Sequence, residues 1–187
     1  MGVHMDERPL NDLHAFDFLT RTWRTSILSA PGSSPPPSPR SFHKMTAVRS
    51  KLYVFGGCST SDRLSDLHCY DTKKGTWEKL PSSADMEGRG GATFLSSADE
   101  NSLFVIAGFC GKESSDVHKY DIRTQTWSKV SDGTFHPRSV CQSARMGDLI
   151  LVFGGEIDPS SKGHEGAGGF ASDVLVFDGN TGTFLRK

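Results

Sequence analysis

The sequence has no long apolar run and no surplus of either charge. Nowhere do its 187 residues contain the roughly 20 consecutive apolar residues that cross a bilayer, and no basic stretch followed by an apolar one opens the chain. The 21 basic and 22 acidic residues give a net charge of -1, which disfavours nucleic acid and anionic membranes as partners. We therefore expect a protein of the cytoplasm or nucleus.

Paired cysteines and helical periodicity are also missing. The four cysteines lie far apart, without any Cys-x-x-Cys spacing, at Cys58, Cys69, Cys110 and Cys141. This spacing disfavours a zinc site or a disulfide framework and indicates free thiols in or beside strands. No stretch repeats its apolar residues with a helical period. The remaining pattern, with 35% hydrophobic residues, predicts a folded domain built from strands.

The clearest positive feature is an internal repeat. An aspartate that stands six residues before a large aromatic occurs four times, as Asp17 before Trp23, Asp71 before Trp77, Asp121 before Trp127 and Asp178 before Phe184. Successive copies of this aspartate are 54, 50 and 57 residues apart. Four matches in one short chain indicate a repeated structural unit. We expect the repeated aspartates, aromatics and glycines to have structural roles, in turns and in packing.

A second recurring half lies between these copies. Three arginines each precede an apolar run that ends in a small residue: Arg40, Arg89 and Arg138 stand before 52–57, 103–108 and 150–155. Short β-branched and aromatic runs that end in glycine are typical of strands followed by tight turns. Each complete unit is therefore predicted to contain four strands, with the arginine at the start of the first.

A unit with four short strands, a glycine pair after the second, Tyr-Asp in the third and Trp in the fourth resembles the kelch repeat. The resemblance implies an all-β fold, the kelch β-propeller, whose four-stranded antiparallel blades stack around a central channel. The chain would hold three complete blades at about 40–80, 89–130 and 138–186, and the outer half of another at 10–28. We expect about fourteen strands, a fragment of a six-bladed propeller, with apolar blade faces that promote self-association.

The three arginines are candidates for ligand binding. In a propeller, Arg40, Arg89 and Arg138 would meet at one rim of the channel, where guanidinium groups bind sulfate, phosphate or carboxylate bidentately. The alternative is that each arginine hydrogen-bonds backbone carbonyls of the adjacent blade, and the sequence leaves both open. Phe42 and Phe109 fall on the same rim, and we predict that they contact the ligand as well.

The segment 155–170 concentrates carboxylates, glycines and a histidine that belongs to no repeat. It joins the second and third strands of its unit and so would lie on the same rim. Glu156, Asp158 and His164 would form a set of oxygen and nitrogen ligands suited to Fe(II) or a similar divalent ion. The alternative is a flexible surface loop with solvated charges.

The order of landmarks looks like that of the plant nitrile-specifier and epithiospecifier proteins and their broader relatives. These landmarks are 39–43, 84–91, 108–111, 116–118, 138–140, 155–158 and 163–164. The resemblance implies Fe(II)-dependent steering of glucosinolate aglucones to nitriles, with a metal motif Glu-x-x-x-Asp-x-x-x-His. On this chain the motif falls on Glu156, Ser160 and His164, so the middle carboxylate is missing there and only the nearby Asp158 or Glu165 could substitute.

Two functions from different classes follow. The first is a binding module whose channel rim takes a partner protein or a small anionic ligand. The second is an Fe(II)-dependent specifier-type lyase. The missing carboxylate favours the first.

Overall fold

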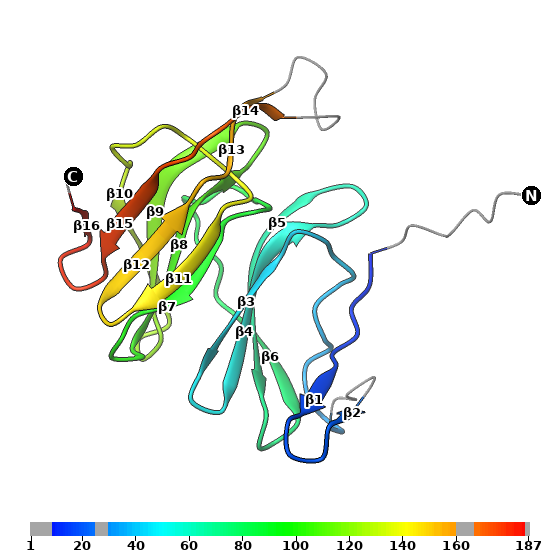
Figure 1. The fold of residues 1–187 in the computed structure, drawn as a ribbon. Helices are drawn as coiled ribbons and strands as arrows, with labels where there is room; N and C mark the ends of the chain where they lie inside the picture. The colour runs from blue at the N-terminus through cyan, green and yellow to red at the C-terminus, as the bar shows by residue number, and fades with distance from the viewer. Residues whose placement is uncertain (1–8, 25–29, 160–166, 186–187) are drawn as a thin grey trace, which may run out of the picture.

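The computed structural model describes residues 9–24, 30–159 and 167–185 of the chain. The described part contains sixteen strands and no helix (Figure 1). It accordingly holds no helix long and apolar enough to cross a membrane. The all-β prediction is confirmed.

Three sheets have four antiparallel strands each, and we call them blades 1 to 3. Blade 1 consists of β3 (Lys44–Val48), β4 (Lys51–Cys58), β5 (Arg63–Asp71) and β6 (Thr76–Leu80). Blade 2 consists of β7 (Thr93–Ser96), β8 (Ser102–Phe109), β9 (Glu113–Asp121) and β10 (Thr126–Ser131). Blade 3 consists of β11 (Gln142–Met146), β12 (Leu149–Phe153), β15 (Val174–Asp178) and β16 (Thr183–Phe184). In each blade the strands pair in chain order, as in a propeller.

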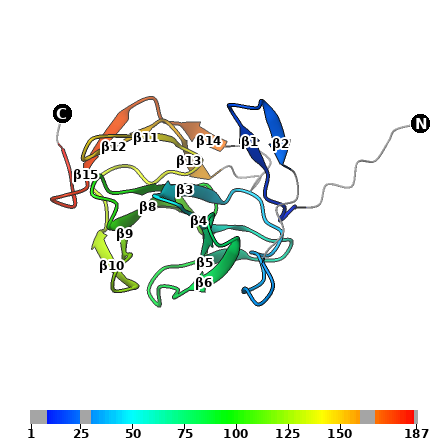
Figure 2. The same cartoon turned by 90° about the horizontal axis from the view of Figure 1, so that it is seen from below.

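Two smaller hairpins complete the described part. The pair β1 (Ala15–Asp17) and β2 (Thr22–Arg24) corresponds to the outer half-unit at the start of the chain. The pair β13 (Glu156–Pro159) and β14 (Ala167–Phe170) lies inside the connection between β12 and β15. This second pair raises the strand count above the expected fourteen. The β1–β2 pair and blade 3 lie at opposite sides of the molecule (Figures 1 and 2).

The repeated aspartate closes the tight turn between the last two strands of each unit. Asp71 Oδ1 accepts hydrogen bonds from the backbone amides of Lys73 and Lys74, and Asp178 Oδ1 accepts them from Asn180 and Thr181. A short carboxylate that binds its own backbone in this way stabilises a turn.

The repeated aromatic packs on the ring that precedes this aspartate. The ring centroids are 5.1 Å apart for Phe16 and Trp23, 5.0 Å for Tyr70 and Trp77, 5.1 Å for Tyr120 and Trp127, and 5.1 Å for Phe177 and Phe184. The sequence repeat therefore corresponds to one local structure, a β-hairpin with two packed aromatic rings, that occurs four times.

The core lies between blades. Along β8, Leu103 and Val105 belong to the cluster shared with blade 1, whereas Phe104 and Ile106 belong to the cluster shared with blade 3. Side chains of a strand alternate between the two faces of its sheet, so blade 2 is buried on both faces. The arrangement is a partial β-propeller in which each blade depends on its neighbours for a core.

The proline-rich segment after β2 packs beside blade 1. The amide of Ala30 donates to Gly75 O at 2.7 Å, and that of Ser34 donates to Trp77 O at 3.1 Å. The chain then reaches Arg40, whose amide donates to Leu10 O at 3.1 Å. Residues 30–40 thus connect the half-unit to blade 1 along its outer strand.

Candidate functional site

The three repeated arginines are buried and bound to aspartates of their own blades. Nη1 and Nη2 of Arg40 donate to the two oxygens of Asp66 at 2.7 and 3.0 Å. Arg89 binds both oxygens of Asp116, and Arg138 binds both oxygens of Asp173 at 2.7 and 3.3 Å. Each Nη1 also donates to a carbonyl at the end of the second strand, on Gly56, Ala107 or Gly154. We call each such pair an Arg–Asp clamp.

A histidine completes the clamp in the first two blades. His68 Nε2 lies 2.8 Å from Asp66 Oδ2, and His118 Nε2 lies 2.9 Å from Asp116 Oδ2. Burial by itself would raise the pKa of these two aspartates, but the hydrogen bonds from the histidine and the arginine outweigh it and hold each pKa well below its usual value. Blade 3 has Leu175 at the corresponding position and therefore lacks the histidine.

The backbone of the same arginines joins neighbouring blades. Arg89 O accepts a hydrogen bond from Gly57 N at 2.8 Å, and Arg138 O accepts one from Gly108 N at 2.9 Å. Gly57 and Gly108 have φ angles of 97° and 111°, a region that favours glycine. A glycine near the end of the second strand of one blade thus binds the arginine of the next blade. This arginine lies four residues before the first strand, contrary to the sequence-based prediction that it stands at the start of that strand.

The clamps bear on the predicted anion site. The bidentate faces of Arg40, Arg89 and Arg138 that would hold an external anion already hold aspartates. Carbonyl hydrogen bonds, the alternative interpretation, are present but go to carbonyls of the arginine's own blade. An external anion would have to share or displace an aspartate, so anion binding by the arginines stays a prediction.

The residue two positions after each arginine adopts a left-handed backbone. The φ angles are 54° at Phe42, 62° at Gly91 and 56° at Val140. A hydrogen bond of 3.0 Å joins Gly91 N to Phe42 O, and one of 2.8 Å joins Val140 N to Gly91 O. The three positions therefore form one continuous line across the three blades. The outer two carry bulky apolar side chains, which are 62% and 38% exposed. For such residues this conformation is a genuine outlier.

Phe109 lies beside the same line. It exchanges two backbone hydrogen bonds with Gly90, at 3.1 and 2.9 Å, and the Arg63 guanidinium carbon lies 4.6 Å from the centre of its ring. A Cβ at Gly90 would approach Phe42 Cβ to 3.1 Å, so Phe42 also borders this glycine. We call Phe42, Phe109 and Val140, which border Gly90 and Gly91, together with Arg63, which contacts Phe109, the rim cluster. Two of its members, Phe42 and Phe109, are predicted ligand-binding residues.

The predicted metal ligands are only partly described. Glu156 stands at the start of β13, where its backbone exchanges two hydrogen bonds with Ser139, at 2.8 and 3.0 Å. Asp158 follows in the same strand, whereas His164, like Ser160, lies outside the described residues. Within the described ranges, no three His, Cys, Asp or Glu residues are placed to hold a metal ion. The Fe(II) site therefore remains a proposal.

Comparisons with known proteins agree with this architecture. A family model described as the KLHDC2/KLHL20/DRC7 Kelch-repeats domain matches residues 2–155. The chain belongs to the kelch-repeat family. The predicted kelch resemblance is thereby confirmed, together with the four-stranded blades that it implied.

This kelch chain is similar to proteins with different printed functions. It is 30% identical over 202 residues to the N-(sulfonatooxy)prop-2-enimidothioate sulfolyase of Thlaspi arvense, covering 96% of this chain and 58% of that protein. It is 34% identical over 170 residues to the leucine-zipper-like transcriptional regulator 1 of Mus musculus, covering 83% and 20%. The Kelch domain-containing protein 1 of Mus musculus is 37% identical over 67 residues, covering 36% and 16%. The chain thus spans 58% or less of the length of these relatives.

The clamp aspartates are the site residues that sequence reasoning missed. Asp66, Asp116 and Asp173 follow a serine at the start of each third-strand motif, and Asp12 stands at the same place in the half-unit. Their recurrence in step with the arginines was the available signal, because a buried guanidinium needs a buried anion. In this kelch chain, the arginine and the aspartate have to be considered as one repeated pair.

Proposed function

We propose that this kelch chain is a binding module that takes a segment of a partner protein at the rim cluster. The observation that carries the proposal is the backbone conformation of Phe42 and Val140. Holding a non-glycine residue in this region costs about 1–3 kcal/mol, and such residues concentrate at ligand clamps and active sites. At the equivalent position of blade 2 the chain has glycine, which adopts the conformation without strain. The two exposed apolar side chains at these strained positions support a role in contacting a partner protein.

The chemistry of the cluster favours an apolar anchor on the partner. Phe42 and Val140 offer exposed apolar surface on either side of Gly91, and Phe109 adds an aromatic ring. The nearby clamp arginines are already paired with carboxylates, which lowers their affinity for an external anion. A small anionic ligand remains the second form of the binding proposal, with Arg40, Arg89 and Arg138 as its contacts.

Substitution of Phe42 by glycine separates a binding role from a structural one. Phe42→Gly removes the backbone strain, so we expect the free energy of unfolding to stay level or rise, by up to about 1 kcal/mol. Peptides selected on the intact chain from a displayed library should lose affinity for this variant at least tenfold. Phe18→Ser, at an exposed site on the β1–β2 turn, is the matched control and should keep the affinity. Unchanged affinity in Phe42→Gly would remove the rim cluster from the proposal.

A second candidate, an Fe(II)-dependent specifier-type lyase, is favoured by the 30% identity to the Thlaspi arvense sulfolyase over 96% of the chain. Glu156, Asp158 and His164 are its proposed ligands. Titration of Fe(II) into the intact chain and into His164→Ala tests the set, because equal binding by the two would exclude the histidine. Ser160→Asp restores the Glu-x-x-x-Asp-x-x-x-His motif and should bind Fe(II) more tightly than the unchanged chain.

A further inference from the structure

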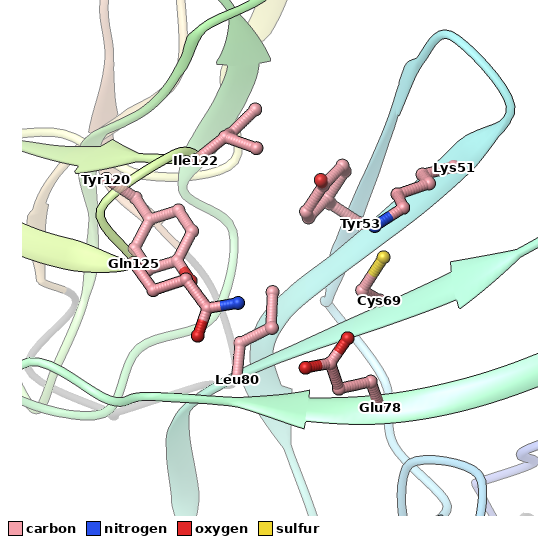
Figure 3. Close-up of a pocket in the computed structure, with 8 residues that line it drawn as sticks. All are labelled: Lys51, Tyr53, Cys69, Glu78, Leu80, Tyr120, Ile122 and Gln125. Carbon is pink, nitrogen blue, oxygen red and sulfur yellow. The ribbon is translucent and has the colours of Figure 1, made fainter. Parts of the chain in front are cut away.

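A small cavity lies between blades 1 and 2, away from the rim cluster. Its volume is about 30 Å³. Figure 3 shows the residues around it: Tyr53, Cys69 and Glu78 come from three adjacent strands of blade 1, and Tyr120 comes from β9 of blade 2. The first three are cross-strand neighbours, since Tyr53 pairs with Cys69 and Cys69 pairs with Glu78.

The hydroxyl of Tyr120 is buried at this cavity without a protein partner. The residue is fully buried, and its Oη has no hydrogen-bond partner among the described residues. Burial raises the pKa of Tyr120 to about 12, and the nearby Glu78 carboxylate adds to the rise, so the hydroxyl keeps its proton at neutral pH. A buried hydroxyl that makes no hydrogen bond is costly and rare in folded proteins. The cavity is the space from which a partner can reach it.

The interface between blades 2 and 3 shows that packing does not require this hydroxyl. The positions of Tyr53 and Tyr120 are occupied there by Phe104 and Phe177. These two rings are both buried and lie 5.2 Å apart between centroids. The same ring positions are therefore buried and packed without a hydroxyl between blades 2 and 3.

We propose that this cavity binds an ordered water molecule that links Tyr120 of blade 2 to blade 1. A water needs roughly 10–15 Å³ of such space and two to four polar partners, and the volume leaves no room for a larger organic ligand. Tyr120 Oη is one partner. On the opposite side, the Glu78 carboxylate can accept a hydrogen bond from the water, and the Tyr53 hydroxyl can donate or accept one. The water supplies the hydrogen bond between blades that the side chains do not make directly.

A high-resolution crystal structure of the intact chain tests the proposal. We expect a solvent peak within about 3.2 Å of Tyr120 Oη and within the same distance of at least one polar atom of blade 1. Absence of the peak, or a direct hydrogen bond from Tyr120 to Glu78, would overturn the proposal.

Substitutions provide a test in solution. The chain has three tyrosines, so magnetisation transfer from bound water to labelled tyrosine rings can be assigned by substitution. We expect transfer to Tyr120 in the intact chain and in Tyr70→Phe, which changes the corresponding ring of blade 1. Tyr53→Phe removes one polar neighbour and should reduce the transfer at least twofold. Transfer that is undiminished in Tyr53→Phe would place the water elsewhere, and no transfer in the intact chain would exclude it.

Discussion

The faces that blades 1 and 2 turn toward the next blade are closed, whereas the same face of blade 3 is open. Phe55 and Ile106 are 1% and 0% exposed, but Phe153, at the same repeat position, is 55% exposed. Leu67 and Val117 are both 0% exposed, whereas Val174 is 38% exposed. The strand pattern is the same in all three blades, so the difference comes from the presence of a following blade. Burial in this molecule is a property of neighbouring pairs of blades.

The largest effect should come from equivalent phenylalanines on a closed and an open face. Phe55→Ala leaves a cavity in the core and should lower the free energy of unfolding by about 3–5 kcal/mol. Phe153→Ala should change it by no more than about 0.5 kcal/mol, as for an exposed site. Urea denaturation followed by tryptophan fluorescence measures both. Equal losses would show that the open face is covered in solution.

The next largest change in the free energy of unfolding should come from breaking the Arg–Asp clamps. Arg89→Met leaves Asp116, whose side chain is 20% exposed, as a largely buried charge without its main partner. Loss of one member of a buried pair costs about 3–5 kcal/mol, and partial exposure places this clamp at or below the lower end. Arg138→Met should cost less, because the side chain of Asp173 is 43% exposed and water can solvate it. Denaturation midpoints of the two variants give the order, and the reverse order would contradict it.

A smaller effect should appear in the pH dependence. The folded pKa of Asp66 and of Asp116 lies below the unfolded value of about 3.9. Their stabilisation is therefore fully present above about pH 5 and is lost as the pH falls toward and below 4. Asp116→Asn should flatten the curve of unfolding free energy against pH in this range. Asp85→Asn, at an exposed position outside the clamps, should leave the slope unchanged, and equal slopes in all three proteins would exclude the clamp as its source.

The smallest effect on folding, but a visible one on association, is expected at the open face. Phe153→Lys introduces a charge at a side chain that the described residues leave exposed, so the free energy of unfolding should hardly change. Open apolar faces promote contact between molecules, and sedimentation should therefore show a lower weight-average mass for the variant at the same concentration. Phe18→Lys alters another exposed ring, on the β1–β2 turn, and serves as the control. A monomeric unchanged chain at high concentration would contradict the expectation.

The blades were predictable because their landmarks are local. Asp71 and Trp77 bracket a single hairpin turn, so their spacing is fixed by the turn and repeats with it. The Arg–Asp clamp was not predicted, because Arg89 lies before β7 and Asp116 lies in β9, and the sequence does not show which aspartate lies beside the arginine. The β13–β14 hairpin was missed for another reason. The run Ala167–Phe170 contains two glycines and no β-branched residue, and it becomes a strand through pairing with β13.

The strain in the rim cluster was invisible in any one repeat. Phe42 and Val140 are ordinary strand residues by composition, and neither signals a left-handed backbone. Only Gly91, at the equivalent place in the second repeat, reveals what the position demands. Alignment of the three repeats with one another would have indicated this left-handed backbone. A position that has glycine in one copy and a bulky residue in the other two is a candidate for a positive φ angle.

The hydrogen bond between a glycine and the following arginine has an implication for how such a chain can grow. Blade 2 contains both halves of the junction, because its Arg89 carbonyl accepts a hydrogen bond from blade 1 and its Gly108 amide donates one to blade 3. A duplication of the DNA that encodes one repeat therefore copies both halves of the junction at once. The added blade arrives with its connections already in register on both sides, without any compensating substitution in the older blades.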